Sequence, residues 1–199
     1  MSTPLVDRRH TFINYLHTLH SALNSSIAHR QSESRRTLAR LRRSLTGPRQ
    51  EADAYKFVFQ HEPPESEQDA WILIAGLFSL HPQSRGQGAR HSTLGGSMGA
   101  LAALRGTSAS RRFEQLLALD RSALPHHLRQ TIRLLATHDI PVDFARLLDD
   151  VIILTGSRYT DEQARAVRLR WARDYHRPPR ATPAANSNDT ESATTDPAN

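Results

Sequence analysis

The stretch AVRLRWARDYHR, residues 166–177, places four arginines and two large aromatic side chains within twelve residues. At 100° per residue, an α-helix over this region has two distinct faces. The apolar face carries Ala164, Val167, Trp171 and Tyr175. The opposite face carries Arg170, Arg173 and Arg177. We therefore predict a helix over residues 161–176 that buries its aromatic side chains and exposes its arginines.

Two charged side chains lie near the border between these faces. Asp174 is one turn from Arg170, at the spacing that lets opposite charges pair on a helix. Arg168 lies at the edge of the apolar stripe, where its stem can cover the boundary of the core.

The same spacing of three and four between apolar residues recurs along the chain, and alternating strand patterns are nearly absent. The predicted helical segments are 6–21, 32–45, 52–60, 67–80, 94–105, 107–120, 124–139, one that Pro141 opens, and 161–176. No sequence period recurs, which argues against a solenoid. The sequence predicts an all-α protein, a compact bundle of eight or nine helices.

Residues 93–112 contain signals for two helix N-caps and for close packing of a helix. Thr93 is expected to cap the segment 94–105, whose glycines (Gly95, Gly96 and Gly99) indicate close packing against a neighbouring backbone. Ser108 or Ser110 is expected to cap the next helix.

That cap would place Arg111 and Arg112 in the first turn of the helix, where the helix dipole disfavours cations. A local rule broken without structural gain favours a functional role for these arginines.

Domain organisation follows from composition. Residues 1–177 are expected to form one helical domain, with two packed subdomains of about 1–105 and 106–177 as an option. Residues 178–199 contain no large apolar residue and are predicted to be a disordered tail. This segment holds one arginine against three acidic residues, so the residues before it carry a formal net charge near +8, above the +6 of the whole chain.

Composition also narrows the classes of function. Lys56 is the only lysine among 26 lysines and arginines. A GC-rich genome could account for that bias, but guanidinium groups also bind phosphate in a bidentate manner. The absence of cysteine excludes disulfides and thiolate metal sites. Charged residues stand where a secretory signal needs an apolar core, and the longest apolar run, residues 71–78, is too short to span a bilayer, so a soluble cytoplasmic protein is expected.

No catalytic or metal site is expected. The histidine pairs 17/20 and 126/127 have no carboxylate one turn away. His138 and Asp139 resemble the HD pair of metal phosphohydrolases, but they precede Pro141 at a helix junction, which favours a turn role for Asp139. Asp149 and Asp150 point about 100° apart. The glycine-rich stretches match neither a P-loop nor a dinucleotide fingerprint, and there is no GxSxG motif. We therefore predict a protein without enzymatic activity, metal or cofactor.

Arginine faces recur on other segments. In SRRTLARLRRSL, residues 34–45, the leucines share one side of the helix, and Arg36, Arg40 and Arg43 share the other. Arg129 and Arg133 lie one turn apart on the segment 124–139. A single such face is usually only solvated, whereas several with few acidic neighbours favour a phosphate-binding surface.

An ordered set of segments resembles a known family. The segments are RRTLARLRRSL (35–45), Trp71 with LFSLHP (77–82), STLGGSMGALAAL (92–104), SASRRFEQLLALD (108–120), LPHHLRQTIRLLATHDIPVDFARLLDDV (124–151) and VRLRWARDY (167–175). Their order resembles the CasB family, the small subunit of the type I-E CRISPR surveillance complex Cascade, over about residues 12–177. The chain departs from the family where VIILTG follows LLDD in place of a common tryptophan, and in its final aromatic pair, Tyr175 and His176. The acidic residues beyond 177 are not part of the resemblance.

The resemblance implies an all-helical, non-catalytic protein, present as two copies along the inner side of the complex. There it would support the hybrid of guide RNA and target DNA and hold the displaced strand during R-loop formation. The implied partners are the large and backbone Cascade subunits, a second copy of the chain, the CRISPR RNA and both DNA strands, with no membrane. The positions that match the family's basic motifs, and thus the predicted nucleic-acid contacts, are Arg40, Arg42, Arg43, Arg111, Arg112, Arg129, Arg133, Arg168, Arg170 and Arg173.

Two other functions remain open from the sequence. One is a helical adaptor that docks on acidic proteins through the same arginine faces. The other, supported by less, is a metal-dependent nucleotide hydrolase.

Overall fold

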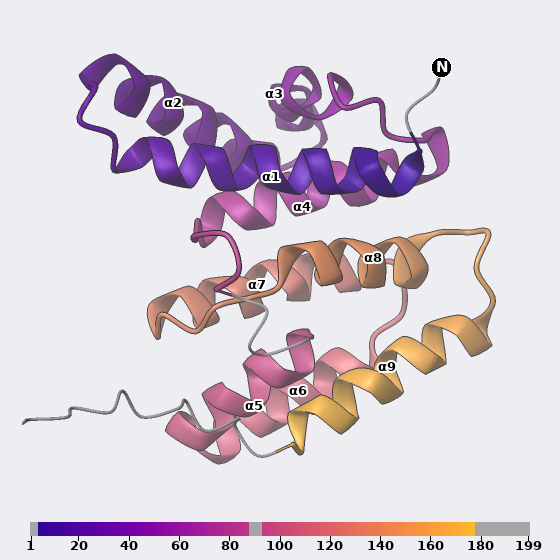
Figure 1. Cartoon of the computed structure of the whole chain (residues 1–199). Helices are drawn as coiled ribbons and strands as arrows, with labels where there is room; N and C mark the ends of the chain where they lie inside the picture. Colours follow the sequence, from indigo (N-terminus) through magenta and orange to yellow (C-terminus); the bar gives the residue numbers. More distant parts are fainter. Residues whose placement is uncertain (1–3, 88–92, 178–199) are drawn as a thin grey trace, which may run out of the picture.

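The computed structural model describes residues 4–87 and 93–177 (Figure 1). Within these ranges the chain forms nine α-helices, one short 3₁₀ helix and no strand, which confirms the all-α prediction. The helices are α1 (Leu5–Leu23), α2 (Ala28–Ser44), α3 (Pro48–Phe59), η1 (Glu65–Glu67), α4 (Gln68–Leu80), α5 (Leu94–Arg105), α6 (Thr107–Ala118), α7 (Leu124–Thr137), α8 (Phe144–Thr155) and α9 (Asp161–Tyr175). None of these described helices is long and apolar enough to cross a membrane. The predicted disordered tail lies outside the described residues.

The helices stack in three tiers (Figure 1). Helices α1 to α4 form one tier, α7 and α8 the middle one, and α5, α6 and α9 the third. Helix α4 joins the first two tiers because it packs against α2 and α3 on one side and against α7 and α8 on the other. The division into subdomains at residue 105 stays a prediction, but α5 packs most extensively against α6 and α9. A boundary drawn by packing therefore falls before α5 rather than after it.

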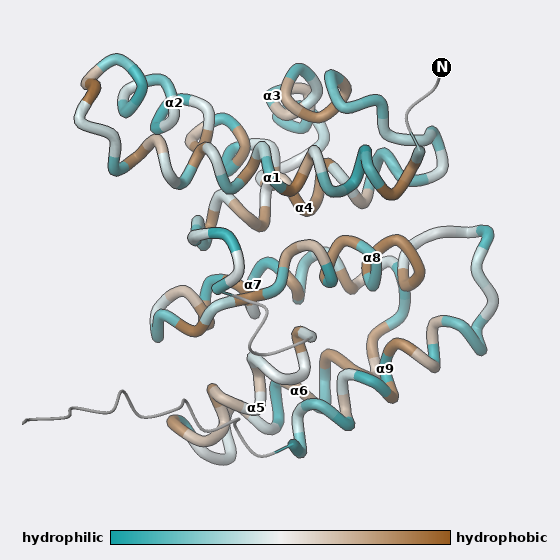
Figure 2. The backbone as a smooth tube through the Cα atoms, in the orientation of Figure 1, coloured by the Kyte–Doolittle hydropathy of each residue, from teal (hydrophilic) through white to brown (hydrophobic). Residues whose placement is uncertain are grey.

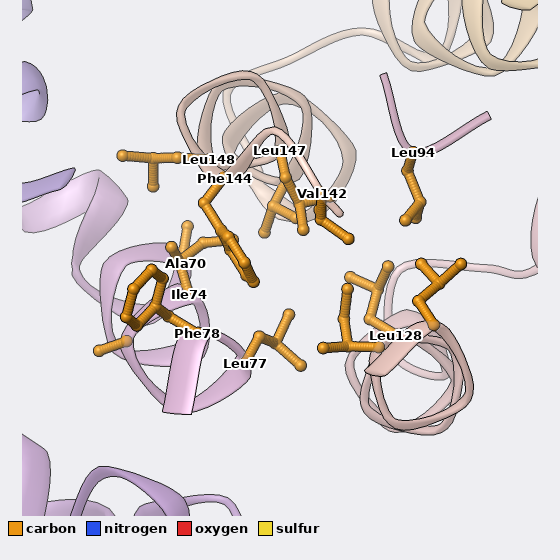
Figure 3. Packing of buried hydrophobic residues seen from close by; sticks show 14 of the residues in the cluster. Ala70, Ile74, Leu77, Phe78, Leu94, Leu128, Val142, Phe144, Leu147 and Leu148 are labelled. Carbon is orange, nitrogen blue, oxygen red and sulfur yellow. The ribbon is translucent and has the colours of Figure 1, made fainter. Parts of the chain in front are cut away.

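All nine described α-helices contribute buried side chains to the core, and the part that joins the first two tiers lies between α4, α7 and α8. Figure 3 shows side chains of α4 facing those of α8 and α7, with Leu94 and Val142 closing the cluster. The labelled side chains of α4 are Ala70, Ile74, Leu77 and Phe78, those of α8 are Phe144, Leu147 and Leu148, and that of α7 is Leu128. The rings of Phe78 and Phe144 meet edge to face, with centroids 5.1 Å apart. Figure 2 shows the contrast between apolar α8 and largely hydrophilic α2.

Two helix starts differ from the sequence predictions. Helix α6 begins at Thr107 because Gly106 turns the chain with φ of 65°, so neither Ser108 nor Ser110 is its cap. Arg111 and Arg112 therefore lie in the second turn, and the predicted dipole conflict is wrong. Helix α8 begins at Phe144 rather than at Pro141, because the Asp143 carboxylate accepts a hydrogen bond from the backbone N–H of Arg146.

Helices α5 and α9 pack backbone to backbone at Gly95 and Gly99, two of the three glycines for which close packing was predicted. A Cβ atom added at Gly95 would overlap the carbonyl oxygen of Trp171, and one at Gly99 would meet the carbonyl of Tyr175. Thr93 does stand at the N-cap of α5, but its hydroxyl donates to Asp174 on α9, at 2.8 Å, instead of capping the helix. The glycines thus allow the arginine-rich helix α9 to pack closely against α5 within the third tier.

Candidate nucleic-acid interface

Helix α9 carries one of its arginines into a buried ion pair. Arg170 donates to the carboxylate of Asp150 on α8, which also accepts a 2.5 Å hydrogen bond from the indole N–H of Trp171. Arg146 lies 3.9 Å from the same carboxylate. We call Asp150, Arg146, Arg170 and Trp171 the Asp150 cluster. The predicted pairing of Arg170 with Asp174 is wrong, because Asp174 accepts from Thr93 and Asp150 is the closer and less hydrated acceptor.

The Asp150 carboxyl is held in a dry environment. Its side chain is 0% exposed, and burial raises its pKa, while the Trp171 hydrogen bond and the Arg170 charge oppose that rise. Asp149 points elsewhere, as predicted, and pairs with Arg9 of α1 at 3.0 Å with a side chain 47% exposed. The two adjacent carboxylates therefore serve different helix contacts.

A second cluster has the same arrangement of one buried carboxylate, two arginines and one tryptophan, and it is centred on Glu67 in the first tier. Glu67 is buried, and its carboxylate accepts from Arg9 at 2.5 Å and from Arg158 at 2.7 Å. The indole N–H of Trp71 lies 3.3 Å from its other oxygen. Both tryptophans thus donate to a buried carboxylate that two arginines approach. Arg9, Arg158 and Arg170 therefore join different elements of the fold, whereas Arg146 pairs with a carboxylate of its own helix.

The arginines of α2 are also engaged. Arg43 binds Asp53 of α3 in a bidentate manner, at 2.5 and 2.9 Å, and this hydrogen bonding lowers the pKa of the Asp53 carboxyl. Arg40 lies 3.7 Å from the same carboxylate and 5.4 Å from the centre of the Phe57 ring. Arg42 donates to the carbonyl oxygen of Ser79 at 2.8 Å. One carboxylate on the neighbouring helix therefore neutralises much of this basic face.

A hollow between α6 and α7 contains arginines but, unlike the clusters above, no carboxylate in its lining. Its volume is about 390 Å³, and we call it the α6–α7 groove. The groove is lined by Ser108, Arg111, Arg112, Gln115, Leu116, His127, Gln130 and Thr131. Arg111 and Arg112 are exposed, and among the described residues no carboxylate lies within ion-pair distance of either. The groove therefore presents two free guanidinium groups beside hydrogen-bonding side chains.

Helix α7 adds two arginines outside the groove lining. Arg133 is exposed, whereas Arg129 is half-buried and its Nε has no hydrogen-bond partner among the described residues. Burial, and then the charge of Arg133, lower the pKa of Arg129. No described carboxylate pairs with either side chain. An anion at this position would relieve both the repulsion and the missing hydrogen bond.

Of the remaining two predicted contacts, one arginine is bound within the protein and the other is exposed. Arg168 donates to the carbonyl oxygen of Leu119, the C-cap of α6, at 2.8 Å. Arg173 is exposed on the side of α9 opposite Trp171 and has no ion pair within the described part of the chain. The sequence grouped the ten arginines together, and the structure brings two of them, Arg111 and Arg112, to the lining of one hollow.

Several relevant residues escaped the sequence analysis. The groove residues Gln115, His127 and Gln130 lie on two helices and carry no motif. Asp150 could have been found, since it lies three residues after Leu147 on the apolar side of α8 and four after Arg146. Asp139 is a turn residue, as predicted, with φ of 51° at the end of α7. Within residues 4–87 and 93–177, no three side chains of metal-binding type gather at one place.

Comparison with known proteins identifies the family. The model of a family described as CRISPR-associated protein Cse2 matches residues 37–176, which is more than half of the chain. The chain belongs to the Cse2 family.

Solved structures agree with this Cse2 assignment. CasB from Thermus thermophilus is 28% identical, with 84% of this chain and 96% of that chain covered and a TM-score of 0.58. CasB from Thermobifida fusca is 23% identical, with 88% and 100% covered and a TM-score of 0.65. A chain of a structure titled "CRISPR RNA-guided surveillance complex" is 18% identical, with 87% and 94% covered and a TM-score of 0.65. These matches confirm the resemblance to the CasB family, while none of the curated proteins matches the chain significantly.

Proposed function

We propose that this Cse2-family chain is the small subunit of a type I-E Cascade complex in the cytoplasm, and that it contacts nucleic acid through the α6–α7 groove. The observation that carries the proposal is the pair Arg111 and Arg112, two exposed guanidinium groups over a hollow without a described carboxylate partner. In such a complex the guide pairs with the target, so the protein needs only phosphate contacts that ignore sequence.

The chemistry of the groove suits a nucleic-acid backbone. Each guanidinium offers a planar fork of donors to a phosphate. Gln115 and Gln130 add neutral donors and acceptors, of the kind that contact sugar and phosphate oxygens. The groove is an open hollow and no described metal cluster accompanies it, which suits binding a strand better than enclosing a small substrate.

The surroundings of the ten predicted arginines rank them by the strength of phosphate contact that we expect from each. Arg111, Arg112, Arg133 and Arg173 are exposed and without described carboxylate partners, so we expect them to make the strongest phosphate contacts. Arg129 follows, since it is half-buried beside Arg133. The five already bound within the protein, Arg40, Arg42, Arg43, Arg168 and Arg170, are expected to contribute less.

The proposal is tested by co-expressing the chain with the other Cascade subunits and a CRISPR RNA, and purifying through this chain. We expect a large complex that contains the RNA. With Arg111→Ala/Arg112→Ala, the complex should still form, but protection of the displaced strand from a single-strand nuclease should fall. The matched control, Arg40→Ala/Arg43→Ala, removes two arginines that share the Asp53 carboxylate, which offsets one of their two charges, and should lose less protection than the groove pair.

Three results would overturn this proposal. Recovery of the chain without RNA or other subunits would remove it from the complex, and recovery with acidic proteins alone would favour the adaptor function. Equal loss of protection in both arginine pairs would show that the α6–α7 groove has no special part in holding the strand.

A further inference from the structure

The end of α9 is fixed against the helix that carries the groove arginines. The Tyr175 ring stacks on Phe113 of α6, with centroids 4.3 Å apart and planes 8° from parallel. Its hydroxyl donates to the Ser110 hydroxyl at 2.8 Å. Tyr175, two residues before the last described residue, Arg177, therefore contacts α6 at a residue next to Arg111 in sequence.

The sequence of residues 178–199 complements the groove in charge. It carries Arg180 near its start and then three acidic residues, Asp189, Glu191 and Asp196, without a further basic residue. These three acids outnumber the one arginine of their segment, while Arg111 and Arg112 have no described acidic partner. Opposite charges in excess on neighbouring parts of one chain attract each other.

The segment is long enough for its acidic residues to reach the groove. Asp189 is twelve residues beyond Arg177, and twelve residues can span at most about 40 Å. The width of an α-helix, about 10–12 Å, is only a fraction of that length. A short tether of this kind gives an effective concentration on the order of millimolar, so a weak attraction is enough to populate the contact.

We propose that the acidic stretch 189–196 binds in the α6–α7 groove and competes there with nucleic-acid phosphates. The competition rests on the proposed function, whereas the contact itself does not. The occupied groove admits only strands whose phosphates displace the carboxylates, which weakens binding to stray nucleic acid. If the stretch fills the groove two thirds of the time, the apparent Kd for a strand rises about threefold.

The contact can be measured without any nucleic acid. The chain has no cysteine, so a nitroxide on Ser192→Cys is the only thiol label. We expect paramagnetic broadening of amide signals over residues 108–115 and 127–131, which is lost in 0.5 M salt because the attraction is screened. The broadening should also be lost with Asp189→Asn/Glu191→Gln/Asp196→Asn. Broadening that is absent, or that survives neutralisation of the three acids, would overturn the proposal.

Competition is measured on the full-length chain by fluorescence anisotropy with a labelled single-stranded oligonucleotide. The triple neutralised variant should bind about threefold more tightly at low salt. The matched control Glu33→Gln/Glu65→Gln/Glu162→Gln changes net charge equally at exposed sites away from the groove, and should change affinity less. In the Arg111→Ala/Arg112→Ala background, the gain should vanish.

The two measurements separate the possible failures. If the broadening is seen but no variant binds the oligonucleotide, the contact is supported and the proposed function is overturned. If the chain binds the oligonucleotide but the neutralised variant and its control change the affinity equally, the proposed function is supported and the competition is overturned.

Discussion

The Asp150 cluster and the α6–α7 groove both place two arginines near a helix pair, yet their surroundings are opposite. In the cluster, Arg146 and Arg170 converge on a carboxylate that is 0% exposed and also bound by Trp171. In the groove, Arg111 and Arg112 are exposed beside neutral polar side chains. The first arrangement stabilises the fold, and the second leaves charge available for an external anion.

This difference shows that an arginine's role depends on where the nearest carboxylate lies in space. A buried carboxylate that loses its partner is costly, so the arginines around Asp150 are committed to it. Exposed arginines without a partner cost little in water and retain their donors for a phosphate. Four perturbations, in order of expected effect, test the contrast.

Asp150→Ala should produce the largest effect. It leaves Arg170 without its partner and the Trp171 N–H without an acceptor, and should lower the free energy of unfolding by about 3–5 kcal/mol. The matched control Asp149→Ala removes the adjacent, half-exposed carboxylate and should cost about 1 kcal/mol or less. Urea unfolding of both variants measures the two values, and equal losses would contradict the assigned difference between these carboxylates.

Gly95→Ala disturbs the cluster from the α5 side. The added methyl group would overlap the backbone carbonyl of Trp171, which cannot rotate away, so a loss of about 1–3 kcal/mol is expected despite alanine's higher helix propensity. The control Gly47→Ala meets only the flexible Gln50 side chain and should change stability little. Thermal unfolding of the two variants provides the comparison, and a Gly95→Ala protein as stable as the parent would show that α5 and α9 can separate.

The arginine pair of the groove should affect binding rather than stability. Arg111→Ala/Arg112→Ala is expected to change the free energy of unfolding by less than about 0.5 kcal/mol. It should reduce the slope of log affinity against log salt by about 1.4 for a single-stranded oligonucleotide, from two lost phosphate contacts. Arg40→Ala/Arg43→Ala serves as the control and should change that slope less, since the Asp53 carboxylate binds both arginines and offsets one of their two charges. Titrations at several salt concentrations measure both slopes.

The smallest expected effect concerns Asp53. Its hydrogen bonds from Arg43 lower the pKa of its carboxyl below the usual 3.8, so its contribution to stability is present above that value and is lost as pH falls through the folded pKa. NMR titration should show the Asp53 carboxyl returning toward 3.8 in Arg43→Ala. An unchanged midpoint would mean that Arg43 is free, like the groove arginines.

The sequence by itself determined the features that depend on local spacing. Apolar residues at intervals of three and four specify each helix and its buried stripe, which is why the all-α class, the burial of Trp171 and the tight glycine contact of α5 were predictable. Neighbouring directions on one helix also follow from spacing, so Asp149 and Asp150 were correctly predicted to diverge. The ordered segments were enough to suggest the family.

Only the tertiary structure decided which arginines are free. Asp53 comes from α3 to neutralise arginines of α2, and Asp150 comes from α8 to bind one of α9. The groove exists only where α6 and α7 meet, so no periodicity within either helix reveals it. Helix periodicity is a local property of the chain, whereas the pairing of charges depends on distances between segments that folding alone brings together.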